Sequence, residues 1–388
     1  MDSKPAPIYV DNAATSFPKP REVIDTISSL LGGMSLSPGR SAHRYSLECS
    51  RIIFEARETL ASFFNCPDSS RIAFACNVTE ALNAGILGLF GTALHPGDHV
   101  ITTPFEHNSV MRPLRYLEKN AGLTLSILPL SDEGEVMVSE LPRLMRDNTR
   151  LIVVNHVSNV TGSVVDLEEI GRLKGECLLM VDAAQSAGVF SIDVKKMHID
   201  MLAFTGHKSL FGPTGSGGFY LREGLALQPL KMGGTGSNSE TEVQPDFMPD
   251  IYEAGTPNTL GIAGLGSGVE FIVKTGLAAI RGHEQRLCAL FLDGLRQLKN
   301  VTVFGPGAGR QRAAVVSLRV KGKSESEVAF RLDREFGVMV RAGLHCAPAA
   351  HRAIGTFPAG TVRFSFGYFN TEKDVATCLR GLDMIAAR

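Results

Sequence analysis

The feature that most limits the fold of this chain is a series of short apolar runs in its middle. Most of these runs are continuously apolar, which is the pattern of strands buried on both faces of a largely parallel sheet. Helical patterns fit between them, and the stretch 78–90 places Leu82, Ile86 and Leu89 on one face. The runs lie at 98–103, 150–155, 177–182, 200–205 and 217–221. We therefore predict a central α/β layered domain.

A second unit is predicted toward the C-terminus. Strand-like runs at 313–320 and 361–367 combine with helical patterns at 324–337 and 371–388, which together indicate a small α+β domain. The helical stretch 283–300 leads into it, and a chain of 388 residues suits two domains. The expected division is a segment 1–20 that packs on the small domain, a large domain at 21–275 and a small domain at 276–388.

Charge and cysteine content narrow the function classes. The net charge is −1, so composition gives no hint of a nucleic-acid or membrane partner. No apolar run reaches membrane-spanning length, and the N-terminus has no apolar signal-peptide core. The seven cysteines are odd in number and contain no CxxC pair, which argues against a disulfide framework and against a zinc site. We expect a cytoplasmic protein with no metal ligands.

Two polar residues follow neighbouring strands of the predicted sheet. Asp182 ends the run 177–182, and Lys208 comes three residues after the run 200–205. Ligands of open α/β sheets bind at the carboxyl ends of strands, so both residues are expected at one edge. Taken singly, each residue would ordinarily be structural. Together they provide what pyridoxal phosphate (PLP) needs: a lysine for the Schiff base and an aspartate that keeps the pyridine nitrogen protonated.

The start of the helical stretch 78–90 offers a place for the cofactor's phosphate. Asn77, Val78 and Thr79 provide backbone N–H groups and a hydroxyl there, and Asn77 with Glu80 resembles a capping box. The glycine-rich stretch 212–218 is not a P-loop, because no Gly-Lys-Ser/Thr follows it. We expect it to form a tight connection into the next strand.

These residues resemble the class V aminotransferase family of fold-type I PLP enzymes and, within it, the cysteine desulfurases. The resemblance rests on VDAAQSAG (181–188) with FTGHKSLFGPTGSGG (204–218) and covers essentially the whole chain. It implies a large domain with a mostly parallel, mixed seven-stranded sheet, a small α+β C-terminal domain and PLP as cofactor. Further motifs in the family's order are YVDNAATS (9–16), CNVTEALN (76–83), FEHNS (105–109), NHVSNVTG (155–162), EAGTPNTLGIAGLGSGVEFI (253–272), VRAGLHCAP (340–348) and TVRFSFGYFNTEKDV (361–375).

The resemblance also implies roles for individual residues. Lys208 binds PLP and then acts as general base at the substrate's Cα. His107 stacks on the ring, where it either relays protons or only packs. Around the cofactor it implies Asn159 beside the ring, Gln185 on the phenolic oxygen, Thr205 and His207 on the phosphate with Asn77, Val78 and Thr79, and Thr256 reaching the phosphate from a partner subunit. Around the substrate it implies Asn12, Ala13, Asn159 and Arg341, with Arg363 binding the carboxylate.

Cys346 is the most specific functional prediction. It lies in a predicted loop between small-domain elements, flanked by Arg341 and His345, which are the expected sources of positive charge. Positive charge nearby favours the thiolate, which is the nucleophilic form of cysteine. The resemblance implies that this thiolate attacks the sulfur of PLP-bound L-cysteine, so that L-alanine leaves and Cys346 keeps a persulfide.

Three hypotheses follow. The first is a cysteine desulfurase. The second is a related reaction: selenocysteine lyase, cysteine-sulfinate desulfinase, transamination or epimerisation, for which Cys346 would matter little. The third is a binding or scaffold protein with lost chemistry, which the intact Lys208, Asp182 and His107 disfavour.

The partners expected by resemblance are a second copy of the chain, with active sites at the interface, and a sulfur-accepting protein. Iron–sulfur cluster assembly, a tRNA-modifying enzyme or another cofactor are open as destinations of the sulfur. Arg40 and His43 lie in a Gly/Pro-rich loop that either borders the site entrance or is simply solvated.

Overall fold

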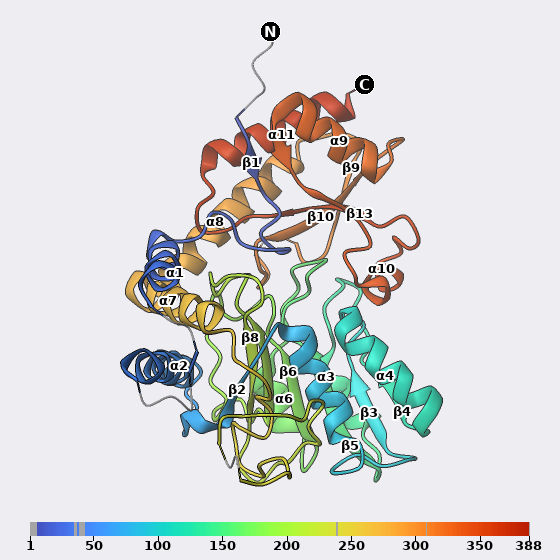
Figure 1. Cartoon of the computed structure of the whole chain (residues 1–388). Helices are drawn as coiled ribbons and strands as arrows, with labels where there is room; N and C mark the ends of the chain where they lie inside the picture. The colour runs from blue at the N-terminus through green and yellow to red at the C-terminus, as the bar shows by residue number, and fades with distance from the viewer. Residues whose placement is uncertain (1–5, 35–36, 39–42, 238–239, 308, 388) are drawn as a thin grey trace.

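The structure is a computed structural model that describes residues 6–34, 37–38, 43–237, 240–307 and 309–387. Its larger part is built on a seven-stranded sheet in the order β2-β8-β7-β6-β5-β3-β4 (Figure 1). The strands are parallel except β8, which runs antiparallel to β7 and β2. The predicted mostly parallel, mixed sheet is therefore confirmed. Its strands are β2 (Ile72–Ala75), β3 (His99–Thr102), β4 (Thr124–Ile127), β5 (Thr149–Asn155), β6 (Leu178–Asp182), β7 (Met201–Thr205) and β8 (Gly217–Leu221).

The continuous apolar runs are explained by two cores, one on each face of this sheet. In β5, Leu151 and Val153 pack into one core, while Ile152 and Val154 pack into the other. Side chains that alternate between two buried faces leave no position for a polar residue. Helices α3 and α4 cover one face, and α2, α6 and α7 cover the other. The helices of this part are α1 (Arg21–Gly33), α2 (Arg44–Phe63), α3 (Val78–Leu89), α4 (Asn108–Ala121), α5 (Leu141–Leu144), α6 (Leu167–Leu173) and α7 (Thr259–Thr275), with 3-10 turns at Ser69–Arg71 and Val138–Glu140.

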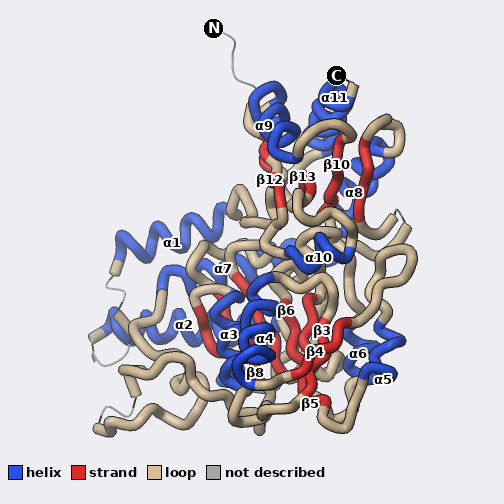
Figure 2. Tube along the Cα trace, turned by 90° about the vertical axis from the view of Figure 1, so that its right-hand side faces the viewer, coloured by secondary structure: helices blue, strands red, loops and turns tan. Residues whose placement is uncertain are grey.

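The smaller part is an antiparallel sheet in the order β12-β13-β10-β9, which confirms the α+β prediction. The sheet lies above the large one in Figure 1, and in Figure 2 α10 lies below it, on the side that faces the large sheet. We propose that the two parts divide at Gly276, where α7 and α8 meet at 82°. The elements are β9 (Val301–Phe304), β10 (Val315–Val320), β12 (Arg341–Gly343), β13 (Thr361–Ser365), α8 (Leu277–Leu295), α9 (Glu325–Phe336), α10 (Pro348–Ala353) and α11 (Glu372–Ala386).

The N-terminal segment contacts both parts. Strand β1 (Ile8–Tyr9) pairs in parallel with β11 (Val338–Met339) beside the small sheet. Farther along, Ser16 Oγ donates to the carbonyl of Lys208 over 2.7 Å, and Thr15 Oγ1 donates to the carbonyl of His207 over 2.8 Å. The segment therefore links the small sheet to the loop that follows β7.

Two local details differ from expectation. Asn77 caps α3 as predicted, since its side chain accepts from Glu80 N, but the Glu80 carboxylate accepts from Cys76 N instead of closing the box on Asn77. The helix expected at 283–300 begins earlier, at Leu277, and ends at Leu295. The position of this helix is fixed by packing of Leu287, Phe291 and Leu295 against the small sheet. The local sequence pattern alone does not show where the helix begins and ends.

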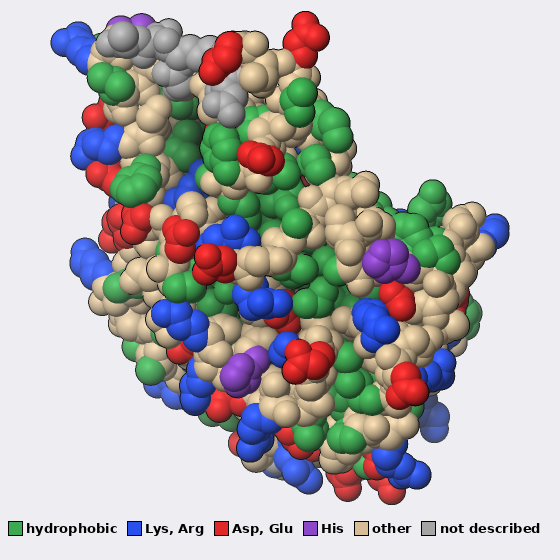
Figure 3. All heavy atoms as spheres, turned by 90° about the horizontal axis from the view of Figure 1, so that it is seen from below, with side chains coloured by type: hydrophobic (Ala, Val, Ile, Leu, Met, Phe, Trp, Pro, Cys, Tyr) green, Lys and Arg blue, Asp and Glu red, His purple; other side chains and the backbone are tan. Residues whose placement is uncertain are grey.

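The surface is of mixed charge where Figure 3 shows it. Lys and Arg side chains alternate with Asp and Glu on this face, and hydrophobic side chains lie between them. Among the described residues, no single helix is both long and apolar enough to cross a membrane, and only the bent pair α7 and α8 together reach that length.

The turn around Gly188 gives a stability prediction. Gly188 has φ +96°, and a Cβ there would overlap the backbone carbonyl of Ser209, the residue after Lys208. Gly188→Ala should therefore destabilise the fold by about 2–4 kcal/mol, combining left-handed strain with overpacking. Gly134→Ala is the matched control, since Gly134 has φ +78° with no atom near the added Cβ. Thermal unfolding should show a clearly larger loss for Gly188→Ala; equal losses would contradict the overlap.

Candidate active site

A cavity of about 270 Å³ lies at the carboxyl ends of β5 and β6, between the large sheet and the small one. Asp182 is the last residue of β6 and pairs with Ala203 of the neighbouring β7, and Lys208 follows β7 by three residues. The chain thus delivers both residues to one edge of the sheet. The cavity is lined by Ala13, Ala14, Asn77, Val78, Thr79, His107, Asn155, Asn159, Asp182, Ala184, Gln185, His207, Lys208, Arg341, His345 and Arg363.

Lys208 and Asp182 influence each other's charge. Burial lowers the pKa of the Lys208 amine to about 8; the negative charge of Asp182 opposes this shift, and Arg363 and Arg341 reinforce it. Burial raises the pKa of Asp182, against the effects of a hydrogen bond from Ala184 N and of the Lys208 charge. A lysine with a pKa near 8 is a substantial fraction neutral amine near neutral pH, which suits it as nucleophile and base.

His107 is fixed in one tautomer. It is the N-cap of α4, and its Nδ1 accepts a hydrogen bond of 3.1 Å from the backbone N–H of Ser109. A backbone N–H can only donate, so Nδ1 carries the lone pair and the ring proton lies on Nε2. Burial, with Lys208 adding to it, lowers the pKa of His107 to about 4. The ring is therefore neutral and carries a donor at Nε2.

Polar groups suited to an anion surround the start of α3. Val78 and Thr79 form its first turn, where backbone N–H groups lack intrahelical partners. Thr79 Oγ1 lies 2.7 Å from Ser109 Oγ. The buried Thr205 Oγ1 and His207 Nδ1 have no hydrogen-bond partner in the part of the chain that the structure describes. Because buried polar atoms are nearly always bonded, these atoms indicate that a polar ligand binds here.

The other face of the cavity holds Gln185, Asn159 and Arg363. Gln185 Nε2 donates to the carbonyl of Ala13 over 2.9 Å, which leaves it a second N–H. Arg363 is 1% exposed; it donates to Asn159 O over 3.0 Å and forms an ion pair of 2.5 Å with Asp11. The arginine expected to bind a carboxylate thus already has one carboxylate partner.

Cys346 lies on an exposed loop at the mouth of the cavity. It lines a groove of about 540 Å³ together with Thr79 and His107, which also line the cavity. His345 and Cys346 both have positive φ, +48° and +57°. Two bonds hold this unusual backbone: Asn159 Nδ2 donates to His345 O over 2.8 Å, and Asn108 N donates to Cys346 O over 2.9 Å. Such strain persists only where surrounding contacts enforce it.

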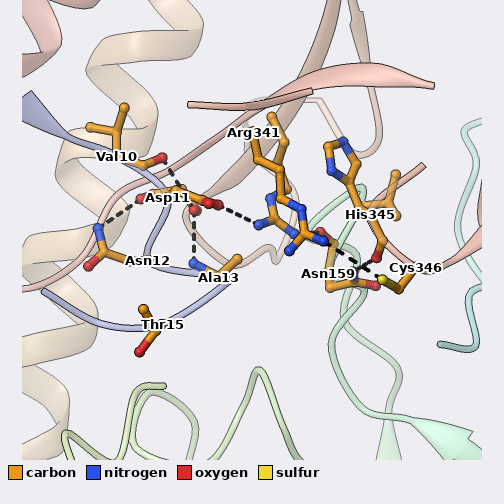
Figure 4. Close-up of polar contacts among 12 residues, drawn as sticks. Val10, Asp11, Asn12, Ala13, Thr15, Asn159, Arg341, His345 and Cys346 are labelled. Carbon is orange, nitrogen blue, oxygen red and sulfur yellow. Dashed lines mark hydrogen bonds and ion pairs between the residues drawn. The ribbon is translucent and has the colours of Figure 1, made fainter. Parts of the chain in front are cut away.

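Of the two residues expected to place positive charge beside Cys346, Arg341 does so and His345 does not. Arg341 Nη2 lies 3.7 Å from Cys346 Sγ, and Figure 4 shows its side chain reaching toward the loop. The expectation for His345 is wrong. Its ring is 3% exposed and bonds Thr361 Oγ1, and burial, followed by repulsion from Arg363, holds its pKa far below the usual value. His345 is therefore a neutral packing residue.

Several predicted residues lie elsewhere. Thr256 lines a separate cavity of about 90 Å³ with Cys76 and Lys231. Asn12 lines a cavity of about 30 Å³, and its amide bonds Ser365 O, Asn370 Oδ1 and Phe17 N. His43 caps α2 through a bond from Ser46 N. Arg40 lies outside the described residues.

Sequence reasoning missed three residues that shape the site. Asp11 pairs with Arg363, and Ser109 orients His107. Glu106 is fully buried under the cavity, where it accepts from Asn155 N and Thr103 Oγ1. Burial raises the pKa of Glu106 to about 8, with the charge of Asp182 adding to the shift. Each lay inside a quoted motif, but its partner was not apparent from the sequence.

Comparisons with known proteins agree with this arrangement. The family model described as aminotransferase class-V matches residues 8–377. A probable cysteine desulfurase of Pyrococcus abyssi is 36% identical over 97% of this chain and 93% of its own. The apo structure of a cysteine desulfurase from Thermococcus onnurineus NA1 superposes with a TM-score of 0.90 at 36% identity, covering 98% of this chain and 94% of that one. The cysteine desulfurase CsdA of Escherichia coli, as an S-sulfonic acid, gives a TM-score of 0.85 at 29% identity over 97% and 94%.

The coupling of Lys208 to Asp182 gives a pH prediction for the cofactor-free protein. Acetic anhydride, which reacts only with neutral amines, should modify Lys208 with a midpoint near pH 8. Because the Asp182 charge raises the Lys208 pKa, Asp182→Asn should move that midpoint to lower pH. Peptide mass spectrometry across pH measures it, with the exposed Lys274 as internal reference. A midpoint that stays put or rises in Asp182→Asn would contradict the coupling.

Proposed function

This chain belongs to the class-V aminotransferase family, and from that premise we propose that it is a PLP-dependent cysteine desulfurase that converts L-cysteine to L-alanine and carries the sulfur on Cys346. The observation that carries the proposal is the contact of Arg341 with Cys346 at the mouth of the cavity that holds Lys208. The name of cysteine desulfurase on its relatives supports the same reaction.

The residues of the cavity fit PLP. Lys208 is positioned to hold it covalently through its amine. The buried Asp182 carboxylate accepts a hydrogen bond from Ala184 N and is acted on by the charge of Lys208, and it forms no ion pair among the described residues. A pyridinium nitrogen would be a cationic partner for it. The unpaired Thr205 Oγ1 and His207 Nδ1 would serve the phosphate with Asn77, Val78 and Thr79. Gln185 would bond the ring's phenolic oxygen, Asn159 would lie beside the ring, and His107 would lie over the ring.

The chemistry divides between the cofactor and the chain. PLP supplies an electron sink that makes the substrate's Cα proton acidic. Lys208, as neutral amine, takes that proton. The neutral His107, which lines the same cavity, keeps its proton at Nε2. Arg363 binds the substrate carboxylate, with Arg341, Asn159, Asn12 and Ala13 as the further candidates for substrate contacts.

Sulfur transfer then occurs at Cys346. Its thiolate attacks the substrate sulfur, the new S–S bond forms, and the Cβ–S bond breaks. The electron pair of the broken bond stays with Cβ, which takes up a proton to become the methyl group of alanine. Lys208 then returns a proton to Cα, which restores the Cα–H bond of L-alanine. Arg341 Nη2, 3.7 Å from Cys346 Sγ, places a positive charge beside the attacking sulfur. The exposed groove beside Cys346 would give a sulfur-accepting protein access to the persulfide.

The related lyase reactions are the second candidate. Selenocysteine lyase or cysteine-sulfinate desulfinase would need the same cavity but no thiol, and transamination or epimerisation would not use the loop at all. The two bonds that hold Cys346 in a left-handed conformation favour the desulfurase, because a loop without a role needs no such restraint.

We also propose a homodimer, in the cytoplasm, with Thr256 reaching the partner's site. Thr256 lines a cavity other than the one with Lys208, which agrees with a contribution to another subunit. Among the large apolar side chains that are more than two-fifths exposed, Leu47 and Phe54 lie on α2, and Met232, Val243 and Phe247 lie in the segment that precedes Thr256.

The function is tested by alanine and sulfide release from L-cysteine with a reductant. The wild type should be yellow and active, Lys208→Ala should lose the bound chromophore, and Cys346→Ser should lose about 100-fold or more activity while staying yellow. Cys66→Ser is the matched control, since Cys66 is a partly exposed thiol on α2's C-terminal side and should keep full activity. An equally active Cys346→Ser would instead support the lyase reading.

The dimer is tested by sedimentation and by hybrids. The wild type should sediment at twice the chain mass. A chain with Lys208→Ala mixed with one carrying Thr256→Ala should form hybrids in which one site lacks both residues and the other lacks neither. Mixing should therefore restore activity above that of either variant alone. No gain on mixing would contradict the contribution of Thr256 across the interface.

A further inference from the structure

Arg363 is a buried cation with an unusual division of its hydrogen bonds. It lies on β13 directly opposite Arg341 of β12, and its side chain is 1% exposed. One terminal nitrogen, Nη2, pairs with Asp11 Oδ1 at 2.5 Å, and the other, Nη1, donates to Asn159 O at 3.0 Å. Nε has no partner among the described residues. Each terminal nitrogen therefore uses one of its two N–H groups, while Nε–H stays open.

The open Nε edge of Arg363 fits a single carboxylate. A guanidinium presents its N–H groups in a rigid planar fork, and an Nε–H beside an Nη–H matches the two oxygens of one carboxylate. Arg363 lines the cavity with Lys208. A buried donor without a partner costs free energy until a ligand supplies one. The α-carboxylate of the substrate is the group that fits.

The Asp11 carboxylate is not needed to anchor its own segment. Backbone bonds do that: Val10 N donates to Met339 O, Asn12 N donates to Ser365 O, and Tyr9 Oη donates to the carbonyl of Asp11. Among the described residues, the Asp11 carboxylate has Arg363 as its ion-pair partner. The Asp11 side chain therefore affects the net charge beside the cavity and the orientation of the Arg363 guanidinium.

Counting charges around this edge shows what Asp11 controls. Arg363 and Arg341 bring two positive charges, while the neighbouring His345 is neutral because burial holds its pKa low. Asp11 neutralises one of the two. The other cations near this edge have further neighbours, since Arg341 lies 3.7 Å from Cys346 Sγ and Lys208 lines the same cavity as Asp182. The negative charge of Asp11 therefore acts against a second negative charge on the substrate.

We propose that Asp11 is a specificity-determining residue, which holds Arg363 with its Nε edge open and sets the local charge so that the site accepts amino acids with one negative charge and disfavours those with two. This rests on the proposed function and deepens it, because it selects L-cysteine over the doubly charged cysteine sulfinate.

The test compares two ligands that differ by one carboxylate, L-alanine and L-aspartate. Their affinities are measured by isothermal titration calorimetry on the protein as purified. The wild type should bind L-alanine more tightly. Asp11→Asn keeps an oxygen for Arg363 but removes the charge, so it should shift the alanine-to-aspartate affinity ratio toward aspartate by roughly tenfold. Asp11→Glu, which keeps the charge, should stay near the wild-type ratio.

The control is Asp293→Asn, which removes an exposed carboxylate paired with Arg296 on α8 and should leave the ratio unchanged. An unchanged ratio in Asp11→Asn would overturn the proposal. So would a wild type that binds L-aspartate as tightly as L-alanine, a result that needs no variant to fold. Calorimetry reads binding alone, so a protein that releases no alanine from cysteine would reject the proposed function without deciding this test.

Discussion

The electrostatic coupling of Asp182 and Lys208 is the constraint on which the rest of the site depends. Parallel pairing of β6 with β7 places the buried carboxylate and the amine at one edge of the sheet. Burial lowers the pKa of Lys208 and raises the pKa of Asp182, which favours the neutral form of each group. The charge of each group opposes the shift of the other. Burial also raises the pKa of the neighbouring Glu106 to about 8, and the charge of Asp182 adds to that shift, so the two carboxyl groups beneath the cavity are coupled as well.

A second constraint is the N-terminal segment, which joins the two parts of the molecule at the site. Val10 and Asp11 lie along the small sheet, where Asp11 pairs with Arg363. A few residues later, Ser16 and Lys19 bond the carbonyls of Lys208 and His207. The strand that carries Arg363 and the loop that carries Lys208 are therefore joined through one short stretch of chain, which helps to fix the distance between these two residues.

The sequence predicted those features that depend on local patterns. Continuous apolar runs indicated β5, β6 and β7, because both faces of these strands are buried. The strand-end positions of Asp182 and Lys208 followed from the same pattern. The pairing of Asp11 with Arg363 spans 352 positions, and no local signal marks it. The neutral state of His345 depends on burial against Thr361, which the sequence did not show, so a charged neighbour for Cys346 was expected where the structure has a packed ring.

The central claim is that L-cysteine bound in the cavity of Lys208 transfers its sulfur to Cys346. The mass of the protein after reaction tests this claim most directly. The purified protein is mixed with L-cysteine without reductant, quenched, and analysed by intact and peptide mass spectrometry. The account predicts one added sulfur atom per chain, located on Cys346, with an equal amount of L-alanine released. Alanine formed with no sulfur on the protein, or with the sulfur on Cys76 or another cysteine instead, would contradict it.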